Sequence, residues 1–456
     1  MKEMLSKVHK IKDTFSLHGG LSGNLRKERL KSLAKVITAK EALITKALHA
    51  DLGKSEFESY ISEIGFILDD IKFMRKNLDS WMTPQKVTTP VPMLPGKSFV
   101  YPDPHGVVLI IAPWNYPFQL CLSPLIGAIA AGNRVVVKPS EIASQTSLII
   151  QEILEDVFEE EEVVVVQGAA KETEALLKEK FDYIFFTGST AVGKVVMKAA
   201  AEHLTPLTLE LGGKSPCIID ESAELSTAVK RIVWGKFLNA GQTCVAPDYI
   251  LIQESLKAAF IEKFKEVVTE FFGTDIKTSS DYPRIINEKH FDRLVALINP
   301  SQVKFGGEHE RAQKFIAPTL LDKVKWDDKI MEDEIFGPLL PMITFKKLED
   351  IIPKILERPR PLALYFFGTN TEAEKKVIER ISFGGGCIND TVIHLANPYL
   401  PFGGTGASGL GSYHGESSFW TFSHKKSVFK QMNKVDIPLR YPPYKTKLNW
   451  IKFFIG

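Results

Sequence analysis

Cysteine is scarce in this chain of 456 residues, and its four cysteines lie far apart. No CxxC pair occurs, and the histidines show neither HxH nor HxxxH spacing. A zinc site needs clustered ligands of this kind, and a disulfide scaffold needs many more cysteines, so neither is predicted. We expect no metal site. A large chain with so few cysteines is typical of the reducing cytoplasm, which is the predicted location.

An excess of one charge and a long apolar run are also missing. The chain has 57 basic and 55 acidic side chains and a net charge of +2, which argues against a nucleic-acid-binding protein. The longest apolar run, residues 107–113, is far shorter than the ~20 residues that cross a bilayer. The first residues, MKEMLSKVHKIKDTF, lack the apolar core of a secretory signal. We therefore expect a soluble protein, with no nucleic-acid partner.

Short apolar runs alternate with helical patterns from residue 106 onward. The runs are GVVLIIAP, RVVVKPS, EVVVVQG and DYIFFTG, and helices are predicted from about 118 and over 143–157, 171–179 and 192–203. Continuous Val/Ile runs are typical of strands buried on both faces of a parallel sheet. This alternation predicts a doubly wound α/β domain whose ligand lies at the carboxyl ends of the strands. Those ends carry residues 114–115, 138–141 and 187–189.

Other segments flank this domain. Residues 1–80 have helical periodicity, whereas residues 83–104 mix prolines with β-branched residues and predict an extended arm or edge strand. A second alternation, over about 214–388, predicts a second α/β lobe. Its elements are helices over 224–239, 255–272 and 371–381, and strands over 249–253, near 316–321 and over 362–367.

Cys244 is the cysteine whose surroundings favour chemistry. It lies in NAGQTCVAPDY, among small and polar residues, where a thiolate could meet a substrate. The alternative is that Cys244 packs as a small hydrophobic residue. Cys121, Cys217 and Cys387 lie in apolar contexts, and we interpret them as packing residues.

Two polar residues stand out near apolar strands. Glu210 lies between leucines in LTLELGG, where it either faces solvent or is a buried base whose pKa is raised. The two glycines after it would allow a ligand to approach the backbone. Asn115, in APWNYP, either satisfies its own turn or donates its amide N–H to a developing oxyanion.

Two glycine-containing segments compete as phosphate sites. Gly188 and Ser189, in FTGSTAVG, lie where a strand turns into a helix, a place that favours phosphate or a simple Ser cap. Gly404, Gly406 and Gly409 spell GxGxxG, but they follow a proline-rich loop and open no βαβ unit, so we reject them as a phosphate site. The role of His414, in the following glycine-rich loop, stays open.

Taken together, seven strings identify a known pattern. VVLIIAPWNYP, VVVKPSE, FTGST-x-VG, LELGGKSP, GQTC, EIFGP and PFGG resemble, in order and spacing, the NAD(P)-dependent aldehyde dehydrogenase superfamily over about residues 25–430. GQTCVAPDY, RPLALYFF and FGGTGASGLGSYHGESSFWTFSH are similar to its class 3 branch, which acts on fatty and aromatic aldehydes. The resemblance implies a Rossmann-like cofactor domain, a second α/β catalytic domain and a β oligomerisation arm.

The resemblance also implies a catalytic set. Cys244 matches the nucleophile, which forms a hemithioacetal with the aldehyde and then, after hydride transfer to nicotinamide, a thioester. Glu210 matches the base that activates water to hydrolyse the thioester to a carboxylic acid. Asn115 and the backbone N–H of Cys244 match the oxyanion hole. The implied substrates are medium- or long-chain aliphatic, or aromatic, aldehydes.

The implied cofactor is NAD or NADP. Lys138 and Glu141 match the residues that bind the adenosine ribose, and Thr187, Gly188 and Ser189 match the turn beneath the pyrophosphate. Glu141 should repel a 2′-phosphate, although class 3 members often accept NADP as well. At the other end of the cofactor, Glu334 matches the carboxylate that holds the nicotinamide ribose, and Phe336 matches the ring packed beside the nicotinamide. Trp114 is also expected to bind the cofactor. Ala191 replaces an acid found in many superfamily members.

The resemblance further divides the chain and names its partners. We expect an NAD(P)-binding domain over 1–82 and 105–209, a catalytic domain over 210–390, an oligomerisation arm over 83–104 and 415–432, and a C-terminal tail over 433–456. A homodimer is expected, with at most peripheral membrane contact through the tail. Two alternatives are a CoA-acylating aldehyde dehydrogenase, against which the base Glu210 argues, and a cysteine esterase that needs no cofactor.

Overall fold

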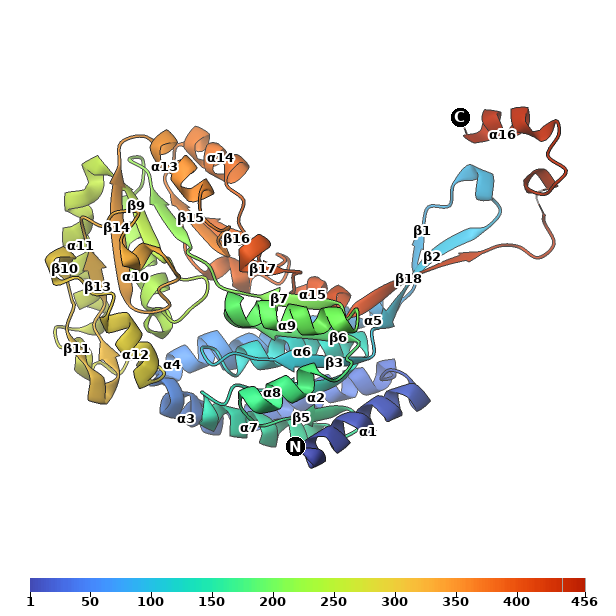
Figure 1. Ribbon diagram of the computed structural model, residues 1–456, viewed down its shortest axis with the longest axis horizontal. Helices are drawn as coiled ribbons and strands as arrows, with labels where there is room; N and C mark the ends of the chain where they lie inside the picture. Colours follow the sequence, from blue (N-terminus) through green and yellow to red (C-terminus); the bar gives the residue numbers. More distant parts are fainter. Residues whose placement is uncertain (437, 456) are drawn as a thin grey trace.

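Two large sheets and a projecting arm organise the computed structural model, which describes residues 1–436 and 438–455. The first sheet lies in the central body, the second forms a separate lobe beside it, and the arm extends from the body on the opposite side (Figure 1). The N-terminus lies on the central body and the C-terminal helix lies beyond the arm. The α/β class expected from the apolar runs is therefore present in both lobes.

The first sheet has the strand order β17-β7-β6-β3-β4-β5. Its strands are parallel except for the edge strand β17, because the others are joined by helices that return the chain to the same end. The inner strands β3 and β4 are buried along their whole length, as their Val/Ile runs predict. The bounds are β3 (Val107–Ile111), β4 (Arg134–Lys138), β5 (Val163–Val165), β6 (Tyr183–Thr187), β7 (Leu207–Glu210) and β17 (Gly409–Leu410).

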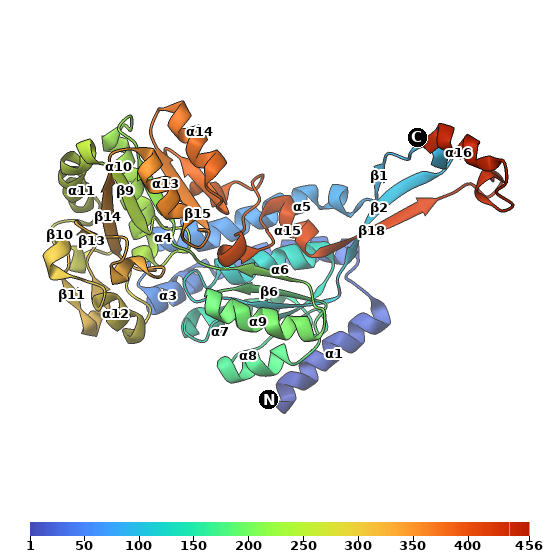
Figure 2. The same cartoon turned by 45° about the horizontal axis from the view of Figure 1, so that its top comes forward.

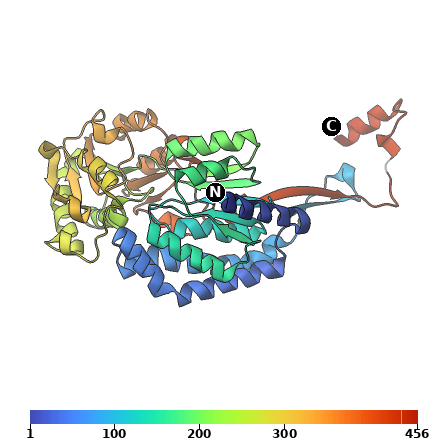
Figure 3. The same cartoon turned by 60° about the horizontal axis from the view of Figure 1, so that its bottom comes forward.

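Helices cover both faces of this sheet. On one face α6 and α7 contact the strands and α2, α3 and α5 pack outside them, while α1, α8 and α9 cover the other face (Figure 3). The bounds are α1 (Lys2–His18), α2 (Gly23–Ala39), α3 (Glu41–Leu52), α5 (Gly65–Met82), α6 (Gln119–Ala131), α7 (Ser144–Val157), α8 (Ala170–Leu177) and α9 (Thr190–Glu202). A short helix α4 (Glu56–Ser59) and a π-helix, η1 (Tyr60–Ile64), lead into α5.

The strand order creates a switch point between β3 and β6. From β3 the chain runs outward through β4 and β5, then returns to the other side of β3 as β6 and β7. Crevices outside the carboxyl ends of strands at such a point are where ligands bind in open α/β sheets. Residues 112–115 after β3, 139–141 after β4 and 188–189 after β6 meet at this edge.

The second sheet has the strand order β10-β13-β14-β9-β8-β15-β16. Its strands are parallel apart from the edge strand β10. Its bounds are β8 (Pro216–Ile219), β9 (Tyr249–Gln253), β10 (Val303–Phe305), β13 (Thr319–Leu321), β14 (Leu339–Phe345), β15 (Ala363–Phe367) and β16 (Gly385–Ile388), and a separate pair is β11 (His309–Glu310) with β12 (Phe315–Ile316). The helices of this lobe are α10 (Leu225–Phe237), α11 (Lys257–Phe272), α12 (Glu288–Val295), α13 (Leu348–Leu356) and α14 (Thr371–Arg380).

Several predicted boundaries in the second lobe are wrong for local reasons. The strand expected near 316–321 is split into β12 and β13 because Pro318 interrupts it. The helix expected over 224–239 ends at Phe237, and Asn239 and Ala240 follow with φ of 52° and 51°. The prediction missed β14 and α13, whose patterns are broken by Pro341 and Pro353.

The boundary between the lobes lies after Glu210, not before it as the predicted range 210–390 implies. Glu210 ends β7 and pairs with Thr187 of β6 and Gly409 of β17, all in the first sheet. The second sheet starts at Pro216. Glu210 therefore lies on the first-sheet side of the junction, and residues 409–410, which the prediction left unassigned, return to that sheet.

The arm is an antiparallel sheet with the order β1-β2-β18. Its bounds are β1 (Gln85–Val87), β2 (Lys97–Pro104) and β18 (Ser423–Lys430), and it projects clear of both lobes (Figure 2). The proline-rich strand β2 is central where β1 covers residues 98–100, but Pro102 and Pro104 pair with β18 alone. The helix α15 (Gly415–Thr421), predicted as part of the arm, packs on α6 in the body instead.

The tail after β18 ends in the helix α16 (Lys447–Ile455). Residues 437 and 456 of the predicted tail lie outside the described residues. Among the helices that the structure describes, none combines the length and the apolar character needed to cross a bilayer.

Candidate active site

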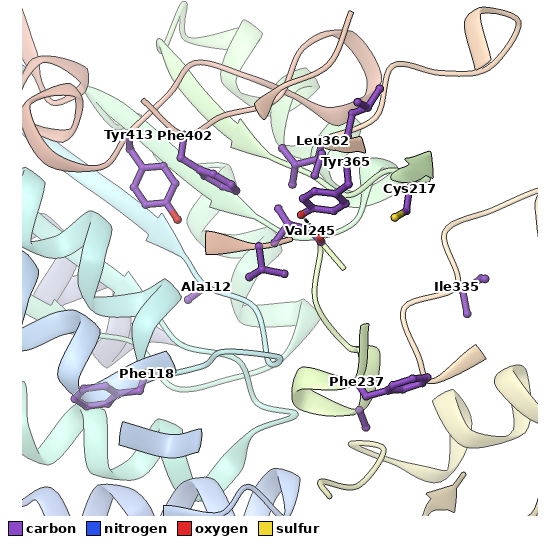
Figure 4. Close-up of a cluster of buried hydrophobic side chains, with 14 of the residues drawn as sticks. Ala112, Phe118, Cys217, Phe237, Val245, Ile335, Leu362, Tyr365, Phe402 and Tyr413 are labelled. Carbon is purple, nitrogen blue, oxygen red and sulfur yellow. Dashed lines mark hydrogen bonds between the residues drawn. The ribbon is translucent and has the colours of Figure 1, made fainter. Parts of the chain in front are cut away.

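An apolar pocket of about 140 Å³ lies at the junction of the two lobes, with Cys244 in its wall. Its lining comes from η1, α5, α6, α10, the Cys244 segment and the C-terminal loops, so residues far apart in sequence converge on it. These are Ile61, Ser62, Phe66, Tyr116, Gln119, Leu120, Trp234, Leu238, Thr243, Cys244, Val245, Val392, Ile393, Leu395, Ala396, Phe402, Tyr413 and His414. Figure 4 shows Val245, Phe402 and Tyr413 in this region.

Cys244 lies between α10 and β9, in a segment held from the second lobe. The hydroxyl of Tyr365 donates to the carbonyl of Val245, the next residue, at 2.5 Å, and Figure 4 draws this bond. Burial first, and then the negative charges of Glu334 and Glu210, together raise the pKa of the Cys244 thiol to about 12. Both carboxyl groups therefore lie within electrostatic reach of the sulfur, and the resting thiol is protonated at neutral pH.

Asn115 follows β3 and is buried beside the Cys244 segment. Its amide Nδ2 donates to the carbonyl of Gln242 at 3.0 Å. The next side chain, Tyr116, joins the same segment through a 2.7 Å hydrogen bond between its hydroxyl and Oγ1 of Thr243. The first-sheet loop and the cysteine loop are thus fixed to each other by side chains.

Glu210 is 3% exposed, and within the described part of the chain neither of its carboxyl oxygens has a hydrogen-bond partner. Burial raises its pKa well above the ordinary value of 4.5. The alternative that Glu210 faces solvent is wrong, because its side chain is buried. A buried carboxyl group without a partner is a costly arrangement, and such arrangements are concentrated at functional sites.

Glu334 packs against Gly212, the first of the two glycines that follow Glu210. A Cβ on Gly212 would lie 1.9 Å from Glu334 Oε2, so a larger residue there would displace the Glu334 carboxyl group. Burial raises the pKa of Glu334 to about 8, and the nearby charge of Asp248 adds to this. Asp248 itself is paired with Lys214, whose Nζ lies 2.6 Å from Asp248 Oδ2.

Trp114 and Phe336 meet across the junction. Their rings are 5.4 Å apart in an edge-to-face arrangement, and His290 packs 4.9 Å from Trp114 on the same side. Phe336 has φ of 50°, a left-handed conformation that directs the chain immediately after Glu334. These residues come from both lobes and place an aromatic surface beside Asn115.

The predicted nucleotide residues lie along the carboxyl edge of the first sheet. Lys138 is buried and donates to Glu141 Oε2 at 2.6 Å and to the carbonyl of Pro139 at 3.0 Å. Ser189 caps α9 by accepting from the N–H of Val192, as a helix N-terminus requires. Among the described residues, the buried Thr187 Oγ1 lacks a partner, a feature that fits a polar ligand above this turn.

The structure also places the glycines that were rejected as a phosphate site and the cysteines that were interpreted as packing residues. Gly409 pairs with Glu210 in β17, and Gly404, Gly406 and Gly409 follow a loop and open no βαβ unit in the described chain. Cys121 and Cys217 are buried. Cys387 is half-buried, with its sulfur 3.4 Å from His394 Nδ1, a contact that the sequence did not predict.

Comparison with known proteins decides the family. The family model described as the aldehyde dehydrogenase family matches residues 3–428. The chain belongs to the aldehyde dehydrogenase family. It is an α/β enzyme that oxidises aldehydes to carboxylic acids with NAD or NADP, which confirms the resemblance seen in the sequence.

Individual relatives cover almost the whole enzyme. The 4,4'-diaponeurosporen-aldehyde dehydrogenase of Staphylococcus aureus (strain NCTC 8325 / PS 47) is 49% identical over 94% of each chain. Aldehyde dehydrogenase family 3 member A2 of Pongo abelii is 45% identical over 98% of this chain and 93% of the relative. The mouse (Mus musculus) protein named aldehyde dehydrogenase, dimeric NADP-preferring is 44% identical over 98% and 99%.

A solved structure is similar along its full length. The structure described as the substrate bound state of Staphylococcus aureus AldH has a TM-score of 0.97 and 47% identity, with 99% of both chains covered. The family 3 relatives and this structure place the aldehyde dehydrogenase in the branch that the C-terminal strings indicated.

The sequence did not point to several residues that shape the site of this aldehyde dehydrogenase. Gln242 accepts from Asn115 and also donates its Nε2 to the carbonyls of Asn239 and Arg284. Tyr116 lies directly after Asn115, so the motif around Asn115 contained the signal. The pocket walls, by contrast, come from aromatic and aliphatic residues that resemble any core residue in sequence.

Glu210→Gln is expected to raise the melting temperature of the cofactor-free aldehyde dehydrogenase, and to raise it more at higher pH. Because the folded-state pKa of Glu210 is raised, the stability linked to its neutral carboxyl group is fully present below about pH 4.5 and is lost as the pH rises through that pKa. Glutamine stays neutral and removes this loss. Thermal unfolding of both proteins from about pH 5 to about pH 9 measures the difference, and a pH-independent difference would contradict the buried carboxyl.

Proposed function

We propose that Cys244, Asn115 and Glu210 oxidise an apolar aldehyde at the inner end of the pocket. The observation that carries this proposal is that one apolar cavity reaches Cys244, whose thiol is electrostatically coupled to Glu210 and whose segment is bonded to Asn115. A nucleophile, an amide donor and a carboxyl base therefore share one site.

Cys244, Asn115 and Glu210 have separate roles in the proposed reaction. The Cys244 sulfur attacks the aldehyde carbon, with loss of its proton, and the Asn115 amide and the Cys244 backbone N–H stabilise the negative oxygen. A nicotinamide held beside Phe336 and Trp114 would supply the hydride acceptor, and loss of hydride from the substrate carbon would leave a thioester on Cys244. Glu210, once ionised, takes a proton from water, and the water oxygen displaces the sulfur to release the acid.

The carboxyl edge of the first sheet is the proposed cofactor site. Lys138 and Glu141 are placed to bind the adenosine ribose, and Thr187, Gly188 and Ser189 to bind the pyrophosphate at the start of α9. Nearer the sulfur, Glu334 would hold the nicotinamide ribose, with Phe336 and Trp114 beside the ring.

The lining of the pocket supports medium- or long-chain aliphatic, or aromatic, substrates. A wider groove of about 520 Å³ shares Ile61, Phe66, Leu395, Ala396 and His414 with the inner pocket, so a long chain has a path toward the surface. His414 stacks on Phe402 with the ring centres 5.1 Å apart, and it acts as part of this wall.

The arm supports a homodimer. Within the described residues β18 pairs with β2 on one side alone, and its open edge carries the half-exposed Val428 and Phe429. An open edge with apolar side chains is stabilised when a second copy covers it. A mouse relative is named dimeric. The tail, with α16, makes at most peripheral membrane contact, and the four unbridged cysteines, all within the described residues, fit a cytoplasmic location.

The first-turnover kinetics of three variants test the catalytic roles. Cys244→Ala is expected to give no NADH, and Asn115→Ala to slow the first turnover by about 10²–10³-fold, because it removes an oxyanion donor. Glu210→Gln is expected to keep a burst of NADH equal to the enzyme concentration and then stall, because the thioester is not hydrolysed. Stopped-flow absorbance of the nicotinamide checks this.

A normal steady-state rate in Glu210→Gln would contradict the role of the base. Added coenzyme A tests the CoA-acylating alternative. If coenzyme A raised the turnover of the wild-type enzyme above its rate in buffer alone, the thioester would pass to a thiol, as in a CoA-acylating enzyme.

The apolar pocket predicts a dependence on chain length. Each added methylene that is buried contributes about 0.8 kcal/mol, so kcat/KM is expected to rise about fourfold per carbon from propanal until the pocket is filled. Leu395→Asp, in the wall, is expected to abolish this rise. Leu400→Asp, at an exposed position outside the pocket, is the control. A flat profile in the wild-type enzyme would contradict the substrate class.

The open edge of β18 predicts an arm-dependent dimer. The wild-type protein is expected to have twice the chain mass of 51.0 kDa in solution, and Val428→Asp to shift it toward the monomer, because a charge on the covered edge must be desolvated. Leu356→Asp, at an exposed position on α13, is the control, with Leu356 50% exposed and Val428 37% exposed. Light scattering after size-exclusion chromatography measures both, and equal masses for all three proteins would contradict the arm interface.

A further inference from the structure

Lys54 is a buried cation directly beneath the loop that carries Asn115. The side chains of Lys54 and Glu63 are both 0% exposed, and Lys54 Nζ lies 2.5 Å from Glu63 Oε1. The same Nζ donates to the carbonyl of Asn115 at 3.2 Å and lies 3.9 Å from the centre of the Tyr116 ring. Two of the three groups around the ammonium therefore belong to the Asn115 loop.

Glu63 fixes the other end of the same loop. Its second oxygen, Oε2, accepts from the N–H of Phe118 at 2.9 Å and from the N–H of Gln119 at 3.1 Å, where α6 begins. A carboxylate at a helix N-terminus satisfies N–H groups that have no partner within the helix. The ion pair thus ties residues 115 and 118–119 to η1, the π-helix that carries Glu63.

Asn239 holds the same carbonyl from the second lobe. Its Nδ2 donates to the carbonyl of Asn115 at 2.7 Å, and its own N–H donates to Glu58 Oε1 at 2.8 Å. Asn239 is buried and has φ of 52°, an uncommon conformation that these bonds maintain. The Asn115 carbonyl therefore accepts two hydrogen bonds, one from each lobe.

Stability alone does not account for the Lys54–Glu63 pair. A fully buried ion pair loses the hydration of both charges, and replacement by packed apolar groups is often neutral or stabilising. The Lys54–Glu63 pair is therefore expected to have a role other than stabilising the fold. The backbone groups that the pair binds are the carbonyl of Asn115 and the N–H groups of Phe118 and Gln119, all in the loop that carries Asn115 or at its end.

We propose that Lys54 and Asn239 are positioning residues that set the direction of the Asn115 amide for oxyanion stabilisation. An Asn side chain has two amide N–H groups, and one of them is used on Gln242. The other reaches the substrate oxygen only when the Asn115 backbone is held in place, which the two bonds to its carbonyl do. This inference rests on the proposed oxyanion role of Asn115.

A double-mutant cycle tests the inference. The variant Lys54→Met with Glu63→Gln removes both charges and keeps one acceptor oxygen, at the position of Glu63 Oε2, for the N–H groups of Phe118 and Gln119. It is expected to slow first-turnover NADH formation about tenfold or more, because misplaced catalytic groups lose rate steeply. Made in the Asn115→Ala background, the same change is expected to alter the rate by less than about twofold, because its effect acts through Asn115.

Two further variants complete the test, one as a control for lost stability and one as an independent test of the same carbonyl. Arg29→Met breaks the Arg29–Glu162 ion pair, at 2.7 Å, which joins α2 to the segment before β5, and it is expected to lower the melting temperature without changing the first turnover. Asn239→Gly keeps the positive φ but removes the amide. It is expected to show the same dependence on Asn115, and it decides the proposal if the Lys54 variant does not fold.

The possible failures are distinguishable. Equal losses of rate in the wild-type and Asn115→Ala backgrounds would mean a general structural role and would overturn this inference alone. An unchanged first turnover in the folded Lys54 variant would do the same. A wild-type rate in Asn115→Ala by itself would overturn the oxyanion role and this inference with it.

Discussion

The hydrogen bond from the Asn115 amide to the carbonyl of Gln242 joins two lobes that are otherwise built as separate sheets. Asn115 follows β3 of the first sheet, and Gln242 lies two residues before Cys244 in the second lobe. Because the pocket, the sulfur and the aromatic pair Trp114–Phe336 all lie at this junction, the geometry of the site depends on how firmly the two loops are held together. The polar groups beneath the loops, including Lys54 and Glu63, supply that restraint.

Burial at the junction also sets the protonation of the site. The pKa of Cys244 and the pKa of Glu210 are both raised by burial, so the resting enzyme holds a thiol and favours a carboxylic acid where the proposed reaction needs a thiolate and a base. A neutral resting site avoids the cost of two buried charges that repel each other.

Sequence patterns predicted the first sheet well because strands such as β3 and β4 are continuous apolar runs between helices. They also singled out Cys244, Glu210 and Asn115, whose polar side chains interrupt apolar or small-residue segments. They did not predict β14 and α13, where Pro341 and Pro353 break the periodicity, nor the lobe boundary after Glu210, which depends on pairing with the distant Gly409. Lys54 was missed because a lysine in a helical, charged region resembles a solvated one until tertiary contacts bury it.

The C-terminal segment has a further consequence for biosynthesis. Gly409 covers the strand edge at Glu210, and Phe402, Tyr413 and His414 complete the pocket, although all four follow nearly nine-tenths of the chain. While the polypeptide is still emerging from the ribosome, the earlier lobes are made but the cavity has no final wall. A nascent chain that stops before residue 402 therefore carries Cys244 without these lining residues, so the pocket is completed only after residues 402–414 have been made.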